Sequence, residues 1–307
     1  EDIVRQVLDL VPFRYRVAWS QNCFVVKLLG SRARGSTLAG HTAPLNGVRF
    51  FPEGDRLLSW GKDGVAIVWN LKSGAIVRRF DLGGNVECAA VFPDGLRIAT
   101  CDPHGETTIW NARSGRSLAI LGQRRTDVQV GVAREFRHRG LEVSPSGDLV
   151  VVWGPREHAV AYDSATATQR CVLRSGPANV GEIFPDNDRV VLGSIEEMAS
   201  SIWSMRRCVR LMTFSAPFVD WVEHVAVVAG GEKVATVHFD AQLIIWDVST
   251  GEAVHTLGRS SLRWMDQIHS LKAIPNDDRV VVSSRSELTI FNATSGEMEH
   301  VFVGAHA

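Results

Sequence analysis

The chain has 307 residues, 45% of them hydrophobic, and a formal net charge of −1 at pH 7 with a pI near 6.9. This balance excludes a field of one sign that would draw the whole molecule onto nucleic acid, an anionic membrane or an acidic substrate. No run approaches the roughly 18 to 20 apolar residues of a membrane span, and the N-terminal residues lack the basic segment of a signal peptide. We therefore expect a cytoplasmic protein, with the nucleus as the alternative. Because the chain begins at Glu1 and not at Met, one interpretation is that it is a domain excised from a longer polypeptide.

Five cysteines are scattered along the sequence, at Cys23, Cys88, Cys101, Cys171 and Cys208. Their number is odd, and no CxxC pair or histidine at metal-ligand spacing accompanies them. We therefore expect a reducing compartment and no metal site. No phosphate-binding loop, dinucleotide fingerprint or pair of carboxylates stands out either, so no cofactor is expected.

The first predicted element to recur along the chain is a turn of the form x-Pro-polar-Gly or Asn, with an apolar run before it and a β-branched run after it. The copies begin at residues 51, 92, 144, 184 and 274 and read FPEGDR, FPDGLR, SPSGDL, FPDNDR and IPNDDR, with a degenerate copy, AGGEKV, at 229. Proline and glycine at these places favour a tight turn between two strands.

After each turn and its strand, a second strand follows that ends in an aromatic residue. These residues are Trp69, Trp110, Tyr162, Trp203, Trp246 and Phe291. Their spacings are 41, 52, 41, 43 and 45 residues, which fits a repeat of about 40 to 45 residues with one insertion. A Ser-Gly or Thr-Gly turn and a fourth short strand complete several copies. The sequence therefore predicts an all-β ring of four-stranded antiparallel sheets and excludes a helical solenoid.

The first 40 residues decide the number of repeats. When the second repeat is shifted back by 41 residues, Tyr15 to Ser20 align with the strand RLLSWG, Leu28 aligns with Trp69, and residues 3–9 align with the first strand. We therefore predict a worn first repeat and seven repeats in all. The alternative is six repeats preceded by an N-terminal extension.

The segment GHTAPLNGVRFFPEGDRLLSWGKDGVAIVWNLKSG, which begins at residue 40, resembles a repeat of the WD40 family. Weaker copies extend the resemblance over nearly the whole chain, and it implies a β-propeller with four-stranded blades. In that family His41, Ser59, Asp63 and Trp69 would form a structural hydrogen-bonded tetrad. The chemistry fits this role, because an indole N–H can only donate and a serine hydroxyl can accept it while donating to imidazole.

Other blades depart from the tetrad pattern. The sixth has Thr236, Asp240 and Trp246 but no recognisable histidine, and the fourth and seventh carry Tyr162 and Phe291 in place of tryptophan. These blades are expected to depend mainly on apolar packing.

Ser59, His41 and Asp63 are also the residue types of a hydrolase triad. However, they occupy the places expected of the structural tetrad, and no GxSxG nucleophile elbow accompanies them. We therefore predict no catalytic residues and no enzyme activity.

The whole chain is predicted to be one propeller domain, 1–307. Its approximate blades are 1–40, 41–82, 83–121, 122–173, 174–214, 215–257 and 258–307.

The insertion 122–140 accounts for the one long spacing and is rich in arginine. It contains Arg124, Arg125, Arg134, Arg137 and Arg139 against two acidic residues. Arginine pairs bidentately with carboxylate or phosphate, so this loop is a candidate site for an anionic partner. The alternative is a solvated loop whose arginines serve solubility.

A second candidate site combines side-chain types that are enriched at protein interfaces. Its members are Phe218, Trp221, Arg263, Trp264 and Met265, from the loops that lead into the sixth and seventh blades. The alternative is that both tryptophans begin their strands and pack between blades.

The predicted function is that of a scaffold or adaptor. The resemblance implies that protein or peptide partners, including acidic ones, bind the face formed by the loops between blades and the turns between second and third strands. The alternative is an RNA- or ribonucleoprotein-associated module that uses the insertion 122–140 and whose affinity falls steeply with salt.

Overall fold

The computed structural model describes residues 15–20, 23–28, 38–102, 106–122, 140–154, 157–194, 196–215, 221–240, 242–257, 268–275, 277–284 and 287–303. Within these ranges the regular structure is β-strand throughout, apart from one short 3-10 turn at Ala229–Gly231. The predicted all-β class is therefore confirmed.

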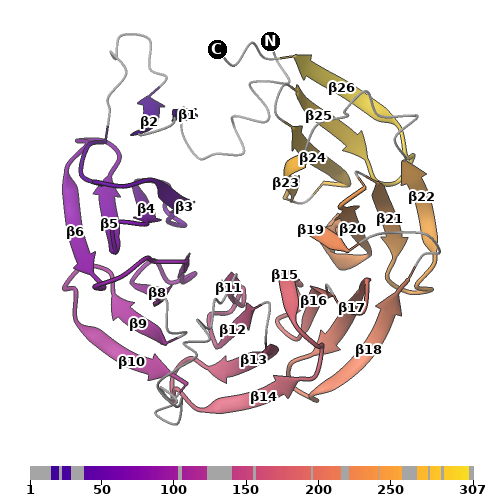
Figure 1. The fold of residues 1–307 in the computed structure, drawn as a ribbon, viewed down its shortest axis with the longest axis horizontal. Helices are drawn as coiled ribbons and strands as arrows, with labels where there is room; N and C mark the ends of the chain where they lie inside the picture. Colours follow the sequence, from indigo (N-terminus) through magenta and orange to yellow (C-terminus); the bar gives the residue numbers. More distant parts are fainter. Residues whose placement is uncertain are drawn as a thin grey trace, which may run out of the picture. The chain divides into compact units, whose positions relative to one another are not determined.

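In this part of the chain, six four-stranded sheets follow one another, and in each the strands pair in sequence order (Figure 1). The first three are β3 (Leu45–Phe50), β4 (Arg56–Gly61), β5 (Val65–Asn70) and β6 (Ile76–Asp81); β7 (Cys88–Val91), β8 (Arg97–Cys101), β9 (Thr107–Asn111) and β10 (Ser117–Leu121); and β11 (Gly140–Val143), β12 (Leu149–Gly154), β13 (Glu157–Asp163) and β14 (Gln169–Leu173). The last three are β15 (Ala178–Ile183), β16 (Arg189–Ser194), β17 (Ala199–Ser204) and β18 (Val209–Phe214); β19 (Val222–Val228), β20 (Lys233–His238), β21 (Leu243–Asp247) and β22 (Ala253–Leu257); and β23 (Ile268–Ala273), β24 (Arg279–Ser284), β25 (Glu287–Asn292) and β26 (Met298–Val303).

Among the described residues the structure has six complete four-stranded sheets, the number given by the alternative prediction. The first repeat contributes β1 (Tyr15–Ser20) and β2 (Cys23–Leu28), which pair antiparallel as a two-stranded sheet. β1 coincides with the stretch that the 41-residue shift aligned with RLLSWG, whereas residues 3–9 lie outside the described ranges. In the sequence Leu28 stands where the other repeats have an aromatic residue, so this segment lacks the large ring that ends the third strand elsewhere.

The chain divides into two compact units, Glu1–Val150 with Tyr162–Gln169 and Val151–Ala161 with Arg170–Ala307. The sheet β11 to β14 has residues in both. In the first unit β3, β7 and β11 lie next to one another, and in the second β15, β19 and β23 do the same. Within each unit, the first strands of successive sheets therefore neighbour each other, as in successive propeller blades.

Each unit has its apolar core between facing sheets. In the first unit Phe51 and Trp60 of the first sheet pack with Ile98 of the second. In the second unit the rings of Phe214 and Trp246 stack with their centroids 5.2 Å apart. This arrangement requires the central strands to be apolar on both sides, and β5 is buried at every residue except Asn70, whereas the edge strand β6 is mostly exposed.

The repeated x-Pro turn has the same backbone closure in five sheets, which confirms the predicted turns. The N–H of its first residue donates to the carbonyl of its sixth at 2.8 to 3.0 Å. In three copies the arginine that ends the turn lies over the ring of the phenylalanine that begins it, as where the guanidinium carbon of Arg97 lies 4.1 Å from the Phe92 ring centroid. The Nε of Arg97 also donates to Asp94 at 2.6 Å.

Three of these turns hold the pKa of a carboxyl below its ordinary value. At Asp94 and Asp186 partial burial acts to raise the pKa, but hydrogen bonds from the backbone and from the turn arginine outweigh it. At Asp277 the hydrogen bond from Arg279 is the largest cause of the lowered pKa.

We predict that Arg97→Ala lowers the free energy of unfolding by about 1 kcal/mol, because it removes a cation from the Phe92 ring and the stem that packs there. Denaturant unfolding at neutral pH measures this loss. The exposed Arg116 provides the control, since Arg116→Ala should change stability by less than about 0.5 kcal/mol. Equal losses in the two variants would contradict a structural role for the stacked arginine.

Candidate functional site

The first four-stranded sheet brings together the four side chains of the predicted tetrad. Trp69 on β5 donates its indole N–H to the Ser59 hydroxyl on β4 at 2.8 Å. Ser59 Oγ lies 2.8 Å from Nε2 of His41, and Nδ1 of His41 lies 2.9 and 3.0 Å from the two carboxylate oxygens of Asp63. One chain of hydrogen bonds therefore runs from the third strand, through the second, to the loop before the first.

The directions of these bonds follow from what each group can do. Trp69 can only donate, so the Ser59 oxygen accepts its N–H and the serine proton is left to donate to His41. His41 then carries its own proton on Nδ1 and donates it to the carboxylate of Asp63, a tautomer that is assigned from the network. Each polar group in this series of four hydrogen-bonded side chains therefore has a partner. Burial requires this, because Ser59 is only 3% exposed.

The loop that carries His41 reaches this position because Gly40 precedes it. A Cβ added at Gly40 would lie 2.8 Å from the Trp69 ring and 3.2 Å from Ile67. No larger residue fits there without moving the tryptophan, so close packing explains why a glycine precedes His41.

Asp63 carries the charge of the site. Burial acts to raise its pKa, but hydrogen bonds from the Thr42 backbone N–H and from His41 outweigh it, so the pKa lies below its ordinary value. The folded pKa is then lower than the unfolded one. The carboxylate therefore stabilises the fold at pH values above its unfolded pKa, and this contribution is lost as the pH falls through the folded pKa.

The order Ser59, His41, Asp63 is that of a hydrolase triad, but the surroundings favour a structural role. A nucleophilic oxygen needs an open approach for a carbonyl carbon. Here the oxygen is buried and accepts the indole N–H of Trp69. The interpretation of these residues as a structural tetrad therefore remains our prediction, now with a geometry that suits it.

The sheet β19–β22, which the sequence analysis counted as the sixth blade, has a histidine that the sequence pattern missed. Trp246 donates to the Thr236 hydroxyl at 2.8 Å, and Thr236 Oγ1 lies 3.0 Å from Nε2 of His238, which is buried. Residues two apart on a strand face the same side, so His238 on β20 supplies the imidazole that a loop supplies in the first sheet. The two-residue spacing of Thr236 and His238 was the feature of the sequence that could have identified this histidine.

Most of the residues predicted to bind partners lie outside the described residues. These are Arg124, Arg125, Arg134, Arg137 and Arg139 of the insertion, and Phe218, Arg263, Trp264 and Met265 of the second site. Trp221 is the one that the structure describes. It directly precedes β19, and its ring lies 4.3 Å, centroid to centroid, from that of Phe239, which follows β20.

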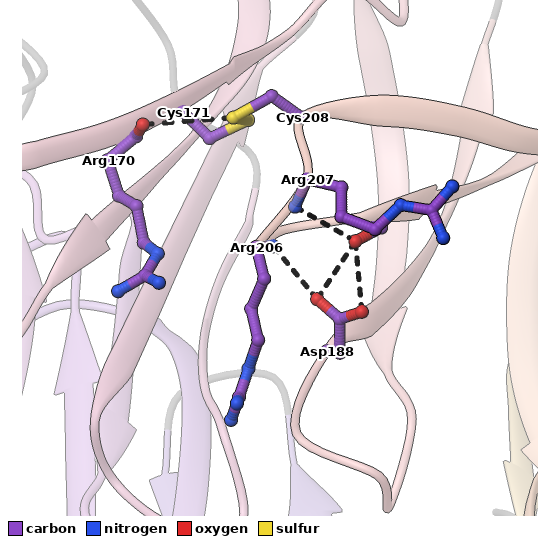
Figure 2. Close-up of a disulfide and its surroundings, with 7 residues drawn as sticks. Arg170, Cys171, Asp188, Arg206, Arg207 and Cys208 are labelled. Atoms are coloured by element: carbon purple, nitrogen blue, oxygen red, sulfur yellow. Dashed lines mark hydrogen bonds between the residues drawn. A yellow bond between two sulfur atoms is a disulfide. The ribbon is translucent and has the colours of Figure 1, made fainter.

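The structure also pairs two of the cysteines, which the sequence analysis treated as scattered residues. Cys171 on β14 and Cys208 before β18 form a disulfide between residues 37 positions apart (Figure 2). The spacing in sequence hid this pair, because the two segments meet only when successive sheets fold. Cys88 and Cys101 are free and buried.

Within the described ranges, no three His, Cys, Asp or Glu side chains gather as a metal ion would need. That part of the chain also holds no helix with the length and apolar character required to cross a bilayer.

We predict that Asp63→Ala lowers the free energy of unfolding by about 1 to 3 kcal/mol, because it leaves His41 and the Thr42 N–H without an acceptor. Denaturant unfolding at neutral pH is the measurement. Asp81→Ala serves as the control, since Asp81 is an exposed acid whose ion pair with Arg79 should contribute little. Unchanged stability in the Asp63 variant would show that the tetrad assignment is wrong.

Comparison with protein families matches residues 33–70 to the model described as WD domain, G-beta repeat. Comparison with curated proteins finds no match. The matched residues span His41, Ser59, Asp63 and Trp69, and five further four-stranded sheets follow the one that they begin. Residues 33–70 are therefore similar to a WD40 repeat, and the six four-stranded sheets of the described residues are consistent with a WD40 β-propeller.

Proposed function

We propose that this chain is a non-catalytic scaffold that binds a protein or peptide through the aromatic pair Trp221 and Phe239. WD40 repeats generally act as protein-interaction scaffolds, and WD40 propellers are typically non-catalytic. The observation that carries the proposal is the exposure of Phe239, which is 49% exposed beside the ring of Trp221.

The position of the pair supports a binding role. Trp221 lies in the loop that leads into β19, and Phe239 begins the turn between β20 and β21. In the WD40 family these two kinds of loop form one face, where partners commonly bind. Aromatic residues supply a large contact area at a small cost in side-chain entropy, and they dominate the free energy of many interfaces.

The pair is also held in place before any partner arrives. The Phe239 N–H donates to the Trp221 carbonyl at 3.0 Å, which joins the two loops through their backbones. Below them His238 is buried and hydrogen-bonded to Thr236. A rigid aromatic surface loses little freedom on binding, and this favours affinity.

The second predicted interpretation, that Trp221 packs between blades, is compatible with this proposal. Trp221 is half-buried, so it can support Phe239 while Phe239 contacts the partner. The arginines of 122–140 remain a proposal for an acidic protein or for RNA, and the experiment below separates these partners.

We predict that Phe239→Ala weakens capture of the bound partner by about tenfold or more while leaving the thermal midpoint unchanged, because the side chain is exposed. Tagged full-length protein would be incubated with cell extract, cross-linked, and compared with the variant by quantitative mass spectrometry. Leu118→Ala is the matched control, because Leu118 is 50% exposed on the edge strand β10.

Partners retained by Phe239→Ala, or lost equally from Leu118→Ala, would contradict the proposal. A parallel arm would neutralise Arg124, Arg125, Arg134, Arg137 and Arg139 at low and moderate salt, with and without ribonuclease. Loss of RNA in that arm would favour the RNA-binding alternative. Ester hydrolysis that Ser59→Ala abolishes in a folded protein would contradict the non-catalytic role.

A further inference from the structure

Cys208 occupies a place that glycine fills in most blades. The turn between third and fourth strands ends in a residue with positive φ in every four-stranded sheet, with values of 71°, 77°, 78° and 74° at Gly74, Gly115, Gly251 and Gly296. Cys208 has a φ of 58° at the same place. A side chain in this left-handed region is strained relative to glycine, and the side chain of Cys208 makes one interaction that a glycine could not.

That interaction comes from the neighbouring sheet. At other seams a long side chain on the fourth strand covers the glycine, so that a Cβ on Gly115 would lie 3.1 Å from Arg78 and one on Gly251 would lie 3.2 Å from Met212. At this seam the covering residue is Cys171, whose Cα lies 5.5 Å from that of Cys208, within the range of a disulfide. Cysteine therefore replaces both members of the pair.

The turn is held independently of the disulfide (Figure 2). The Cys208 N–H donates to the Ser204 carbonyl at 2.9 Å. The Ser204 hydroxyl donates to the Asp188 carboxylate at 2.9 Å, and the same carboxylate accepts the Arg206 backbone N–H at 2.8 Å. When the S–S bond opens, these bonds still keep Cys208 opposite Cys171, so closure remains possible.

The two sulfur atoms differ in access. Cys208 lies on an exposed turn, whereas Cys171 is only 2% exposed. An external thiol can therefore reach Cys208. Three exposed arginines, Arg170, Arg206 and Arg207, flank the two cysteines along the chain, and positive charge favours both thiolates and anionic reagents.

We propose that Cys208 is a thiol–disulfide exchange site, at which low-mass thiols that carry carboxylates open and close the link between these two sheets. A thiolate attacks the Cys208 sulfur, the S–S bond breaks, and its electron pair leaves on the Cys171 sulfur. A second thiolate then attacks the reagent's sulfur in the mixed disulfide and releases Cys208 as a thiolate. Two thiols of the reagent are oxidised to a disulfide, and the protein disulfide is reduced to two thiols.

In the reduced form each protein thiolate takes up a proton from the solvent or from the reagent thiols. Cys208 Sγ lies 3.8 Å from the Arg170 carbonyl oxygen, which a protonated thiol can use as an acceptor.

Cys88 and Cys101 provide an internal control for exchange. They lie opposite each other on β7 and β8, are free and buried, and burial raises the pKa of the Cys88 thiol. Buried thiols react slowly.

The first experiment equilibrates the full chain with reduced and oxidised glutathione at several ratios. The sample is quenched in acid, unfolded and alkylated, and each cysteine peptide is quantified. Cys171 and Cys208 should pass together from alkylated to protected as the oxidised share rises, while Cys88 and Cys101 stay alkylated. A pair that is alkylated at every ratio, or protected even in excess reduced glutathione, would overturn the proposal.

Two variants keep the test independent of folding. Cys208→Gly suits the positive φ, so it should fold and should abolish the several-degree difference in thermal midpoint between oxidised and reduced protein. Ala167, with a φ of 58°, has the same place in the preceding sheet. Ala167→Gly should relieve the same strain and leave the redox difference intact. A redox difference that persists in Cys208→Gly would overturn the assignment.

The last arm tests the role of charge. The double variant Arg206→Gln with Arg207→Gln retains the backbone N–H groups that Asp188 and Ser204 bind. Its rate of opening by glutathione should fall several-fold at low salt, while opening by the cationic thiol cysteamine should not fall. Equal changes for both reagents would overturn the preference for carboxylate-bearing thiols.

Discussion

An indole N–H shielded from water needs an acceptor, and at Trp69, Trp110 and Trp246 a hydroxyl on the neighbouring strand supplies it. Trp69 and Ser59 form this bond in the sheet β3–β6, and Trp246 and Thr236 form it in the sheet β19–β22. A buried donor without a partner costs about 1 to 3 kcal/mol, so the aromatic residue and the hydroxyl have to remain together. Each bond joins the third strand to the second within the buried part of its sheet.

The two sheets differ in which segment supplies the histidine that hydrogen-bonds to this hydroxyl. In the first sheet the imidazole comes from the loop before the first strand, so the bond ties that loop and its Asp63 partner to the core. In the sheet β19–β22, His238 comes from the second strand itself, whereas the loop that carries Trp221 precedes the first strand. That loop instead pairs through its backbone with Phe239 and presents aromatic surface. The proposed binding site is therefore at the sheet in which a strand, and not a loop, supplies the imidazole that bonds to the buried hydroxyl.

The sequence predicted the elements whose determinants are local. Proline and glycine at fixed places specify the x-Pro turns, and a shift by one repeat located β1 at Tyr15–Ser20. It predicted His41, Ser59, Asp63 and Trp69 because their spacing resembles a family pattern. It missed His238, which satisfies the same need from a different strand, and it missed the disulfide of Cys171 with Cys208. Both depend on which segments face each other after folding, and spacing along the chain does not specify that.

The arginine–aspartate pairs of the x-Pro turns affect the stability of the protein in acid. Asp94, Asp186 and Asp277 sit in equivalent turns of different blades, and each has a pKa below its ordinary value. Each carboxylate therefore stabilises its own blade above its unfolded pKa, and that contribution is lost as the pH falls through the folded pKa. Since such turns recur, protonation in acid removes a stabilising carboxylate from several blades. Acid is therefore expected to destabilise several blades of this repeat protein and not one blade alone.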